Sequence, residues 1–374
     1  SQRRSVGRIA LGMSGGVDSA VSAALLLRAG YEVIGVTCRF RDDAANAQAA
    51  ADAAAVCAHL GIEHIERDCV EMFERVVICP FVSAYVEGLT PSPCVGCNAL
   101  CKVPALLEAG DACGCDRVAT GHYARIVRMR ASGRFAVKTA LDIRKDQSYM
   151  LALLSQDQLA RLVLPLGGTT KVDVRLTAAD LDLPVAEKPE SQDVCFVEGD
   201  YRDFLRERGV VDAPGAIVDR TGRELGRHGG LANYTVGQRK GIGVAAEEPY
   251  YVVGKHVETG ELVVGFAEDA QIGAVRVRGL QWQDVSRPPE PRAVFVKLRY
   301  RSRAVPCIIK PEGSCGARIA LGADILSGAV FAAGVFGSFA PKLGAALFAR
   351  LLFGVVITRY VIEFVRVLLE RGET

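Results

Sequence analysis

Residues 8–29 read RIALGMSGGVDSAVSAALLLRA, which is an apolar run, a glycine-rich turn and a stretch rich in alanine and leucine. The run Arg8–Met13 predicts a buried strand, and Ala20–Ala29 predicts a helix. Glycines between them let the backbone turn sharply, so that its N–H groups and the helix start face an anion. Ser14 and Ser19 add hydroxyl donors. The stretch therefore predicts a strand, a phosphate-binding loop and a helix.

Asp18 adds a carboxylate to this loop. A carboxylate would repel bound phosphates unless it holds a divalent cation or orients a neighbouring group, so Mg²⁺ is an expected cofactor. The loop lacks the lysine of the G-x-x-x-x-G-K-[ST] pattern, which argues against transfer of a terminal phosphoryl group in that style. A plain strand-to-helix turn with a capping serine is the alternative interpretation.

The alternation of short β-branched runs with alanine-rich stretches continues to about Thr120. This pattern is typical of βαβ units on a parallel sheet, so we expect an α/β domain over residues 1–150. Further strands are expected at Glu32–Arg39, Glu63–Asp68 and Arg117–Thr120, and helices near Ala44–Leu60 and Met72–Gly88.

The pattern after residue 150 predicts a small helical central domain, 151–212, and then a β-barrel domain, 213–312. Helical signals fall at Gln156–Leu164, Lys171–Leu181 and Tyr201–Arg208. From residue 215 short strands alternate with turn residues, and a barrel would close their edges. The expected strands are Ala216–Asp219, Tyr250–Val257, Glu261–Gly265, Val275–Gln283 and Ala293–Ile309.

Residues 313–374 do not continue this pattern, and we expect an atypical apolar tail that is helical from Gly316 on. The stretch Ile325–Pro341 carries no charge and lies at the lower limit of length for a bilayer span. Leu343–Leu369 has helical spacing, with charges recurring every three or four residues. Membrane contact, a buried or interface helix and a divergent terminus all remain open.

Composition limits the function classes only weakly. A chain of 374 residues suits two or three domains, and 45 Lys and Arg against 43 Asp and Glu exclude neither nucleic acid nor acidic partners. The 12 cysteines, with no signal-like segment in residues 1–10, indicate a reducing, cytoplasmic setting. Half of them cluster in one region, which calls for a chemical explanation: Cys79, Cys94, Cys97, Cys101, Cys113 and Cys115.

Four further motifs carry polar or thiol groups. In Thr90–Asn98, two prolines are expected to hold a loop extended and to present Cys94 and Cys97. Ala119–Tyr123 follows a strand, so it should lie at the carboxyl edge of the sheet, where open α/β folds bind ligands. The other two motifs are Lys145–Tyr149 and Ser191–Phe196, the second of which contains Cys195.

The glycine-rich loop resembles the PP-loop of the N-type ATP pyrophosphatases, which cleave ATP to AMP and pyrophosphate. Together with the four motifs, with Thr235–Gly241 and with Arg299–Arg301, residues 1 to about 310 closely resemble the tRNA-specific 2-thiouridylase family. That resemblance implies ATP-dependent replacement of the 2-oxygen of the tRNA wobble uridine by sulfur.

The resemblance also implies roles for individual residues. Cys97 would be the nucleophile, Cys195 would carry sulfur as a persulfide, and Asp18 would act with them. The expected nucleotide site comprises Gly12, Met13, Ser14, Gly15, Gly16, Val17, Asp18, Ser19, Cys38 and Gly121. The expected tRNA contacts are Ser92, Pro93, Cys94, Lys145, Asp146, Gln147, Arg299 and Tyr300.

The implied partners are tRNAs for Lys, Glu and Gln and a cysteine desulfurase or sulfur-relay protein. Many family members have Asp where this chain has Cys94, so Cys94, Cys97 and Cys195 could instead hold a [4Fe–4S] cluster, with Cys101 as a competing ligand. A zinc site is a further alternative.

The remaining rival functions are an adenylating amidoligase, which leaves the thiols unused, and a non-catalytic iron–sulfur or membrane-tethered RNA-binding protein. A structural role is expected for Cys57, Cys69, Cys79, Cys113, Cys115 and Cys307, and hydrogen bonding in its loop for His122.

Overall fold

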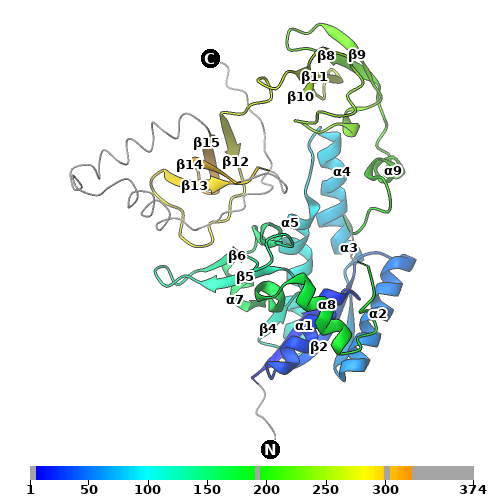
Figure 1. Ribbon diagram of the computed structural model, residues 1–374, viewed down its shortest axis with the longest axis vertical. Coiled ribbons are helices and arrows are strands. Elements are labelled where there is room, and N and C mark those ends of the chain that lie inside the picture. Colours follow the sequence, from blue (N-terminus) through cyan, green and yellow to red (C-terminus); the bar gives the residue numbers. More distant parts are fainter. Residues whose placement is uncertain (1–5, 190–193, 299–303, 322–374) are drawn as a thin grey trace, which may run out of the picture. The chain divides into compact units, whose positions relative to one another are not determined.

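The computed structural model of the protein describes residues 6–189, 194–298 and 304–321, and these fall into two compact units (Figure 1). The first unit is built from residues 6–71 and 95–189 together with the described residues from 273 on. The second unit is built from residues 72–94 and 194–272. Each unit therefore combines segments that are distant in sequence. The division of the chain at residues 150, 212 and 312 stays a prediction.

A five-stranded parallel sheet, in the order β3-β2-β1-β4-β7, forms the centre of the first unit. It confirms the predicted α/β class. Strands β2 and β3 have the bounds expected from the sequence. The strands are β1 (Arg8–Gly12), β2 (Glu32–Arg39), β3 (Glu63–Asp68), β4 (Arg117–Ala119) and β7 (Leu162–Val163).

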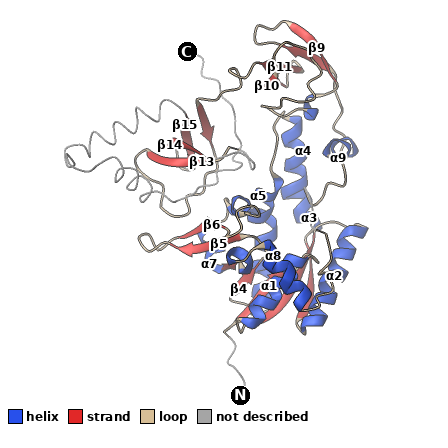
Figure 2. Ribbon diagram, in the orientation of Figure 1, coloured by secondary structure: helices blue, strands red, loops and turns tan. Residues whose placement is uncertain are grey.

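Helices cover both faces of this sheet (Figure 2). Alternate side chains of a strand point to opposite faces. Ile9 and Leu11 of β1 accordingly pack with α1, α2 and α8, whereas Ala10 packs with α6. The helices are α1 (Val17–Arg28), α2 (Ala44–Leu60), α6 (Val103–Ala112), α7 (Gln156–Arg161) and α8 (Lys171–Asp180).

Strand β7 corrects the expectation of a helix over Gln156–Leu164. Helix α7 ends at Arg161, Leu162 takes an extended conformation, and Leu162–Val163 pairs with Val118–Ala119 of β4. Two residues are too few to show a strand period, so tertiary pairing decides their conformation. Short 3₁₀ segments follow or precede these elements: η3 (Ser148–Leu151) and η4 (Pro165–Gly168) in this unit and η5 (Leu231–Asn233) in the other.

The expectation that prolines hold an extended loop around Cys97 is wrong. Helix α5 (Pro93–Cys97), the π-helical segment η2 (Asn98–Lys102) and α6 follow one another without a break. Pro93 occupies the first position of α5, where a helix does not need the missing N–H. Cys97 is 7% exposed, so its thiol is buried rather than presented.

Both π-helical segments of the chain's described part lie just before a proline. Segment η1 (Glu74–Ile78) precedes Pro80 of α4 (Cys79–Val86), and η2 precedes Pro104 of α6. Proline cannot donate to the carbonyl four residues back, and its ring crowds that carbonyl. The turn is widened instead: the N–H of Cys79 donates to Glu74 O and that of Val103 to Asn98 O, each five residues back.

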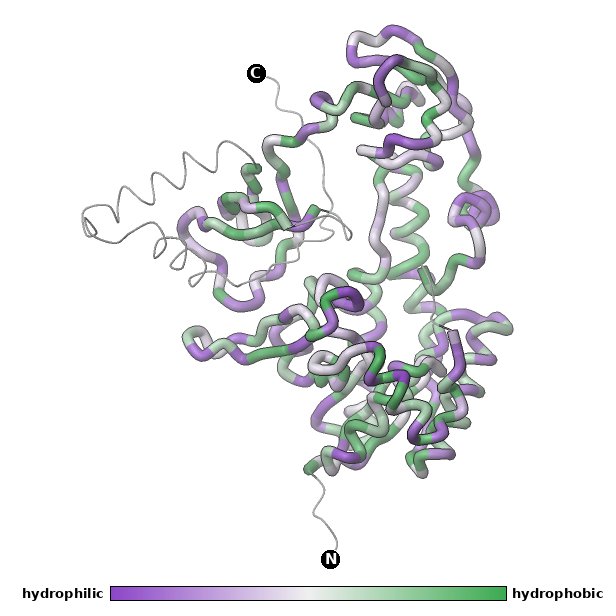
Figure 3. The backbone as a smooth tube through the Cα atoms, in the orientation of Figure 1, coloured by the Kyte–Doolittle hydropathy of each residue, from purple (hydrophilic) through white to green (hydrophobic). Residues whose placement is uncertain are grey.

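The second unit combines a sheet in the order β10-β11-β8-β9 with a cluster of aromatic rings. Most of α4 is coloured as hydrophobic in Figure 3, and its Phe81 joins Phe73, Phe196 and Phe204 in edge-on or tilted ring contacts. The elements are α3 (Val70–Phe73), α9 (Tyr201–Glu207), β8 (Gly215–Val218), β9 (Glu224–His228), β10 (Tyr251–His256) and β11 (Glu261–Gly265).

The remaining strands belong to the first unit. The hairpin β5–β6 is hydrogen-bonded through Ser132 and Arg134 to the backbone of residues 282–284. The later strands form an antiparallel sheet in the order β12-β15-β14-β13, so the strands expected from residue 213 on are divided between two sheets. The bounds are β5 (Ala124–Arg128), β6 (Phe135–Thr139), β12 (Ala274–Val277), β13 (Arg292–Val296), β14 (Val305–Glu312) and β15 (Gly316–Leu321).

Strand β15 corrects the expectation that the helical tail begins at Gly316. Ala317 and Ile319 are fully buried at alternate positions, which is the strand period. The rest of the tail, 322–374, including the stretch for which membrane contact was considered, lies outside the described residues. Among the helices of the described part, none is both long and apolar enough to cross a membrane.

Candidate active site

The glycine-rich loop joins β1 to α1, as the sequence predicted. Gly15 has φ +64°, a left-handed conformation, and a Cβ there would lie 2.3 Å from the carbonyl oxygen of Ala49 in α2. Only glycine fits this close approach. Gly16 is the N-cap of α1, and no side chain caps it. The N–H groups at the helix start are thus left for a ligand or water.

Two serines form hydrogen bonds within the loop. The Ser19 hydroxyl donates to Gly16 O at 2.9 Å and accepts from Ser14 N–H at 3.3 Å, and the two hydroxyl oxygens are 3.3 Å apart. These hydrogen bonds hold the loop in shape. The structure brings together the residues predicted from Gly12 to Ser19.

Gly121 lies against the same turn, as the resemblance implied. A Cβ at Gly121 would be 3.1 Å from the carbonyl carbon of Asp18 and 3.2 Å from Ser19 N. The segment Ala119–Tyr123, at the carboxyl end of β4, thereby reaches the first turn of α1. Nearby, His122 Nδ1 is 2.8 Å from Thr120 Oγ1, and burial lowers the pKa of His122 to about 3. His122 is therefore a neutral hydrogen-bonding residue, as expected.

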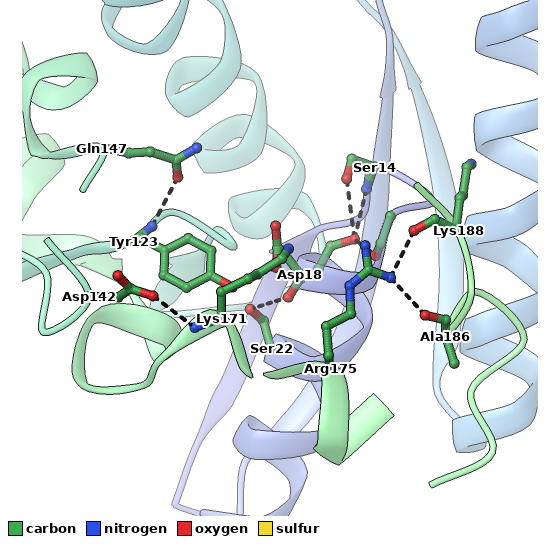
Figure 4. Close-up of polar contacts among 12 residues, drawn as sticks. Ser14, Asp18, Ser22, Tyr123, Asp142, Gln147, Lys171, Arg175, Ala186 and Lys188 are labelled. Carbon is green, nitrogen blue, oxygen red and sulfur yellow. Dashed lines mark hydrogen bonds and ion pairs between the residues drawn. The ribbon is translucent and has the colours of Figure 1, made fainter. Parts of the chain in front are cut away.

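Two residues that the sequence interpretation did not assign to the site converge on Asp18 (Figure 4). The Tyr123 hydroxyl donates to Asp18 Oδ1 at 2.8 Å, and Lys171 Nζ donates to the same oxygen at 2.7 Å. The ammonium also lies 5.7 Å from the centre of the Tyr123 ring. Tyr123 and Lys171 belong to different parts of the chain, so no local motif could have joined them.

A second lysine holds the loop from its other side. Lys188 Nζ donates to Gly15 O at 2.9 Å and pairs with Asp52 of α2. That hydrogen bond lowers the pKa of Asp52. Arg175 of α8 donates to Ala186 O at 2.7 Å and to Lys188 O at 2.8 Å, which fixes the segment that carries Lys188 (Figure 4).

The predicted tRNA contacts at 145–147 make structural hydrogen bonds here. Asp146 accepts from Ala140 N–H and from the Ser148 hydroxyl, each at 2.8 Å. Gln147 Oε1 accepts from Tyr123 N–H at 3.0 Å, and Gln147 N–H donates to Tyr123 O at 2.8 Å. Asp146 and Gln147 thus fix the loop that carries Tyr123. A role of Lys145, Asp146 and Gln147 in tRNA binding stays a prediction.

Cys97 is buried at the end of α5, in the first unit. A hydrogen bond from Cys101, one turn further on, lowers the pKa of the Cys97 thiol to about 7, aided by the charge and the backbone N–H of Lys102 against the opposing effect of burial. The same pairing, with burial, raises the pKa of Cys101. Of the two thiols, Cys97 is therefore the one that loses its proton first as the pH rises, and the thiolate is the nucleophilic form.

A second pair of thiols adjoins this one. Cys38, near the end of β2, forms a hydrogen bond with Cys69, which follows β3. This bond and burial both raise the pKa of Cys38, whereas for Cys69 the bond lowers the pKa against the opposing effect of burial. Cys69 also acts electrostatically on Cys101. Cys69 was expected to be structural only, and the place of Cys38 in the nucleotide site stays a prediction.

Cys195 lies in the second unit and is exposed. The next residue, Phe196, is 2% exposed and contacts Phe73 and Phe81 with ring centres 5.6 and 5.2 Å apart. The chain at Cys195 is therefore anchored by its neighbour. Ser92, Pro93 and Cys94 also belong to the second unit.

The metal predictions are not supported by an assembled site. Within the residues that the structure describes, no three His, Cys, Asp or Glu side chains come together to hold a metal ion. A cluster on Cys94, Cys97 and Cys195 therefore stays a prediction. Arg299 and Tyr300, the expected tRNA contacts of the last strands, lie outside the described residues.

A glycine-rich loop between the first strand and first helix of a parallel sheet, with an ionisable thiol in the same unit, defines a nucleotide-binding α/β protein of the PP-loop class. Residues 7–199 match the family model described as tRNA methyl transferase HUP domain, and residues 202–266 match tRNA methyl transferase PRC-barrel domain. The chain is 45% identical over 318 residues to the tRNA-specific 2-thiouridylase MnmA of Chloroflexus aurantiacus, covering 82% of this chain and 88% of that protein. It belongs to the tRNA-specific 2-thiouridylase (MnmA) family.

Two further proteins show how the similarity extends. MnmA of Carboxydothermus hydrogenoformans is 42% identical over 319 residues, covering 82% of this chain and 87% of that protein. Among solved structures, the U34-tRNA thiolase NcsA of Methanococcus maripaludis, with its [4Fe–4S] cluster, aligns with 55% of this chain and 64% of its own at 18% identity and a TM-score of 0.34.

Proposed function

We propose that this protein is a tRNA-uridine 2-sulfurtransferase, which uses ATP to replace the 2-oxygen of the wobble uridine by sulfur. Membership of the MnmA family supports this function. The observation that carries it is the Cys97 thiol, which has a pKa of about 7 and shares one compact unit with the loop from Gly12 to Ser19. An amidoligase of the same loop class would have no use for such a thiol.

In the first step the uridine 2-oxygen attacks the α-phosphorus of ATP, which forms an adenylated base and releases pyrophosphate. The N–H groups at the start of α1 and the Ser14 hydroxyl would bind the phosphates. Asp18 is already bound by Lys171 and Tyr123, so the protein offers Mg²⁺ at most a partial set of ligands. Mg²⁺ usually takes its other ligands from phosphates and water, and bound there it would neutralise phosphate charge.

In the second step a persulfide on Cys195, loaded by a cysteine desulfurase or relay protein, attacks C2 of the activated base. A carbon–sulfur bond forms, AMP leaves with the 2-oxygen, and one proton is released. The Cys97 thiolate then attacks Cys195 Sγ, which frees 2-thiouridine and leaves a Cys97–Cys195 disulfide for an external dithiol to reduce.

The proposal also covers the substrates, the residues by the target base and the cellular setting. Its substrates would be tRNAs for Lys, Glu and Gln, with Ser92, Pro93 and Cys94 by the target base, and its setting would be the cytoplasm. A [4Fe–4S] cluster on Cys94, Cys97 and Cys195 is the alternative to the persulfide, since three thiolates would leave one iron open for sulfide.

The decisive experiment is nucleoside mass spectrometry of unmodified tRNA after incubation with the protein, ATP, Mg²⁺, a cysteine desulfurase and cysteine. We expect 2-thiouridine from the wild type and from Cys315→Ser, an exposed cysteine in a turn, and none from Cys97→Ala. Parallel reactions with iron-reconstituted and chelator-treated protein separate the cluster from the persulfide. ATP cleavage to AMP without any thiouridine would instead support the amidoligase.

A further inference from the structure

The nucleotide loop contains no lysine, yet the structure places one beside it. Lys171 begins α8, far along the chain, and its ammonium lies 2.7 Å from Asp18 Oδ1. Its side chain is only 12% exposed. Figure 4 shows Lys171, Asp18 and Tyr123 converging at the start of α1, the end of the loop where phosphates are expected.

The position of Lys171 on its own helix is electrostatically unfavourable. A capping box of Thr170 and Asp173 defines the start of α8, so Lys171 is its first residue. Helix starts carry partial positive charge and favour anions. Ordering and burying a lysine chain costs side-chain entropy as well. Asp18 and the Tyr123 ring offset these costs, which indicates that the fold specifies where the ammonium lies.

We propose that Lys171 forms a pyrophosphate subsite, in which its ammonium binds the β- and γ-phosphates of ATP and stabilises the departing pyrophosphate. An ammonium has three N–H donors, so Lys171 can keep its bond to Asp18 and still bind phosphate. Asp18 and Tyr123 act as positioning residues that hold the ammonium through one shared oxygen. The subsite rests on the proposed function and names the residue that binds the leaving group.

This arrangement also explains how a negatively charged carboxylate can lie in a phosphate-binding loop. Asp18 alone would repel phosphates, but the ammonium of Lys171 neutralises its charge. Lys188 has a different task, because its ammonium is bound to Gly15 O and to Asp52. Lys188 braces the backbone of the loop, so it serves as the comparison for a purely structural lysine.

The test is equilibrium binding of ATP, AMP and inorganic pyrophosphate to the full-length protein without tRNA, by titration calorimetry. Lys171→Met should weaken ATP and pyrophosphate binding about tenfold to a hundredfold, the range for one charge-assisted hydrogen bond, and leave AMP binding unchanged. Unchanged AMP binding also shows that the variant is folded. Lys171→Arg should recover part of the loss.

Two matched lysine variants complete the design. Lys188→Met should weaken ATP and AMP binding alike, because it loosens the loop itself. Lys138→Met, an exposed residue of β6, should change neither. The subsite is overturned if Lys171→Met lowers ATP and AMP affinity equally, or lowers neither, while the wild type binds both. A wild type that binds no adenine nucleotide would refute the proposed function itself.

Discussion

Cys97 and Cys195 stand in opposite surroundings. Cys97 is buried within a helical run, hydrogen-bonded to Cys101 and close to the charge of Lys102. Cys195 is exposed in a turn, and the residue after it, Phe196, has a buried ring. The Cys97 thiol is thus buried and ionisable, whereas the Cys195 thiol is exposed next to a buried aromatic ring.

The contrast suggests that the two thiols have different partners. A buried thiol with a pKa near neutrality can react inside a closed site but cannot easily be reached by another protein. An exposed thiol can accept sulfur from a donor protein, and a rigid neighbour keeps it in place.

Serine at either position should stop multiple-turnover thiolation, with a loss of about a thousandfold or more, as for the removal of other nucleophiles. The trapped species should differ. Cys97→Ser should accumulate tRNA joined to Cys195 through a disulfide, because the attack that releases product is missing, whereas Cys195→Ser should form no adduct. Denaturing gels with and without dithiothreitol show this adduct. An adduct on Cys195→Ser instead would reverse the two roles.

Phe196→Ala should destabilise the second unit by about 3–5 kcal/mol, because it removes a buried ring from an aromatic cluster. Thermal unfolding followed by circular dichroism measures the loss. Phe266→Ala, a partly exposed ring of the same unit, is the comparison and should cost much less. Equal losses for the two variants would mean that Cys195 is not anchored by Phe196.

Cys101→Ala should slow alkylation of Cys97 by iodoacetamide about tenfold at pH 7, as the thiol returns toward its ordinary pKa. The Cys101 hydrogen bond stabilises the thiolate, so reactivity is present above about pH 7 and is lost as the pH falls through it. Peptide mass spectrometry across pH 5–9 gives the midpoint for each cysteine. The Cys195 profile serves as the internal control, and an unmoved Cys97 midpoint would contradict the assigned cause.

Tyr123→Phe should reduce ATP affinity by a few fold, since it removes one hydroxyl donor to Asp18 and keeps the ring under the Lys171 ammonium. Calorimetric titration of ATP and AMP measures the effect. The loss should be smaller than for Lys171→Met and should disappear in the Lys171→Met background. Full additivity of the two substitutions would show that Tyr123 does not act through Lys171.

Local patterns predicted much of the fold and the loop. Strand β2 and helix α2 have the expected bounds because strong periods and a buried run determine them. The close approach at Gly15 follows from glycine geometry. The contacts that complete the site are long-range: Asp18 and Lys171 are 153 residues apart, and Cys38 meets Cys69 only through sheet pairing. No hydrophobic period or local motif predicts such long-range contacts.

The widened turn before Pro104 changes the direction of the Cys97 side chain relative to α6. Each residue of an α-helix turns the chain by about 100°, so in an unbroken helix Cys97 would point nearly opposite to Leu106, which faces the sheet core. One inserted residue shifts the phase of everything downstream by about a quarter of a turn. Cys97 and Leu106 can then both face inward. Pro104, which has no reactive atom of its own, thus determines the direction in which the Cys97 thiol points.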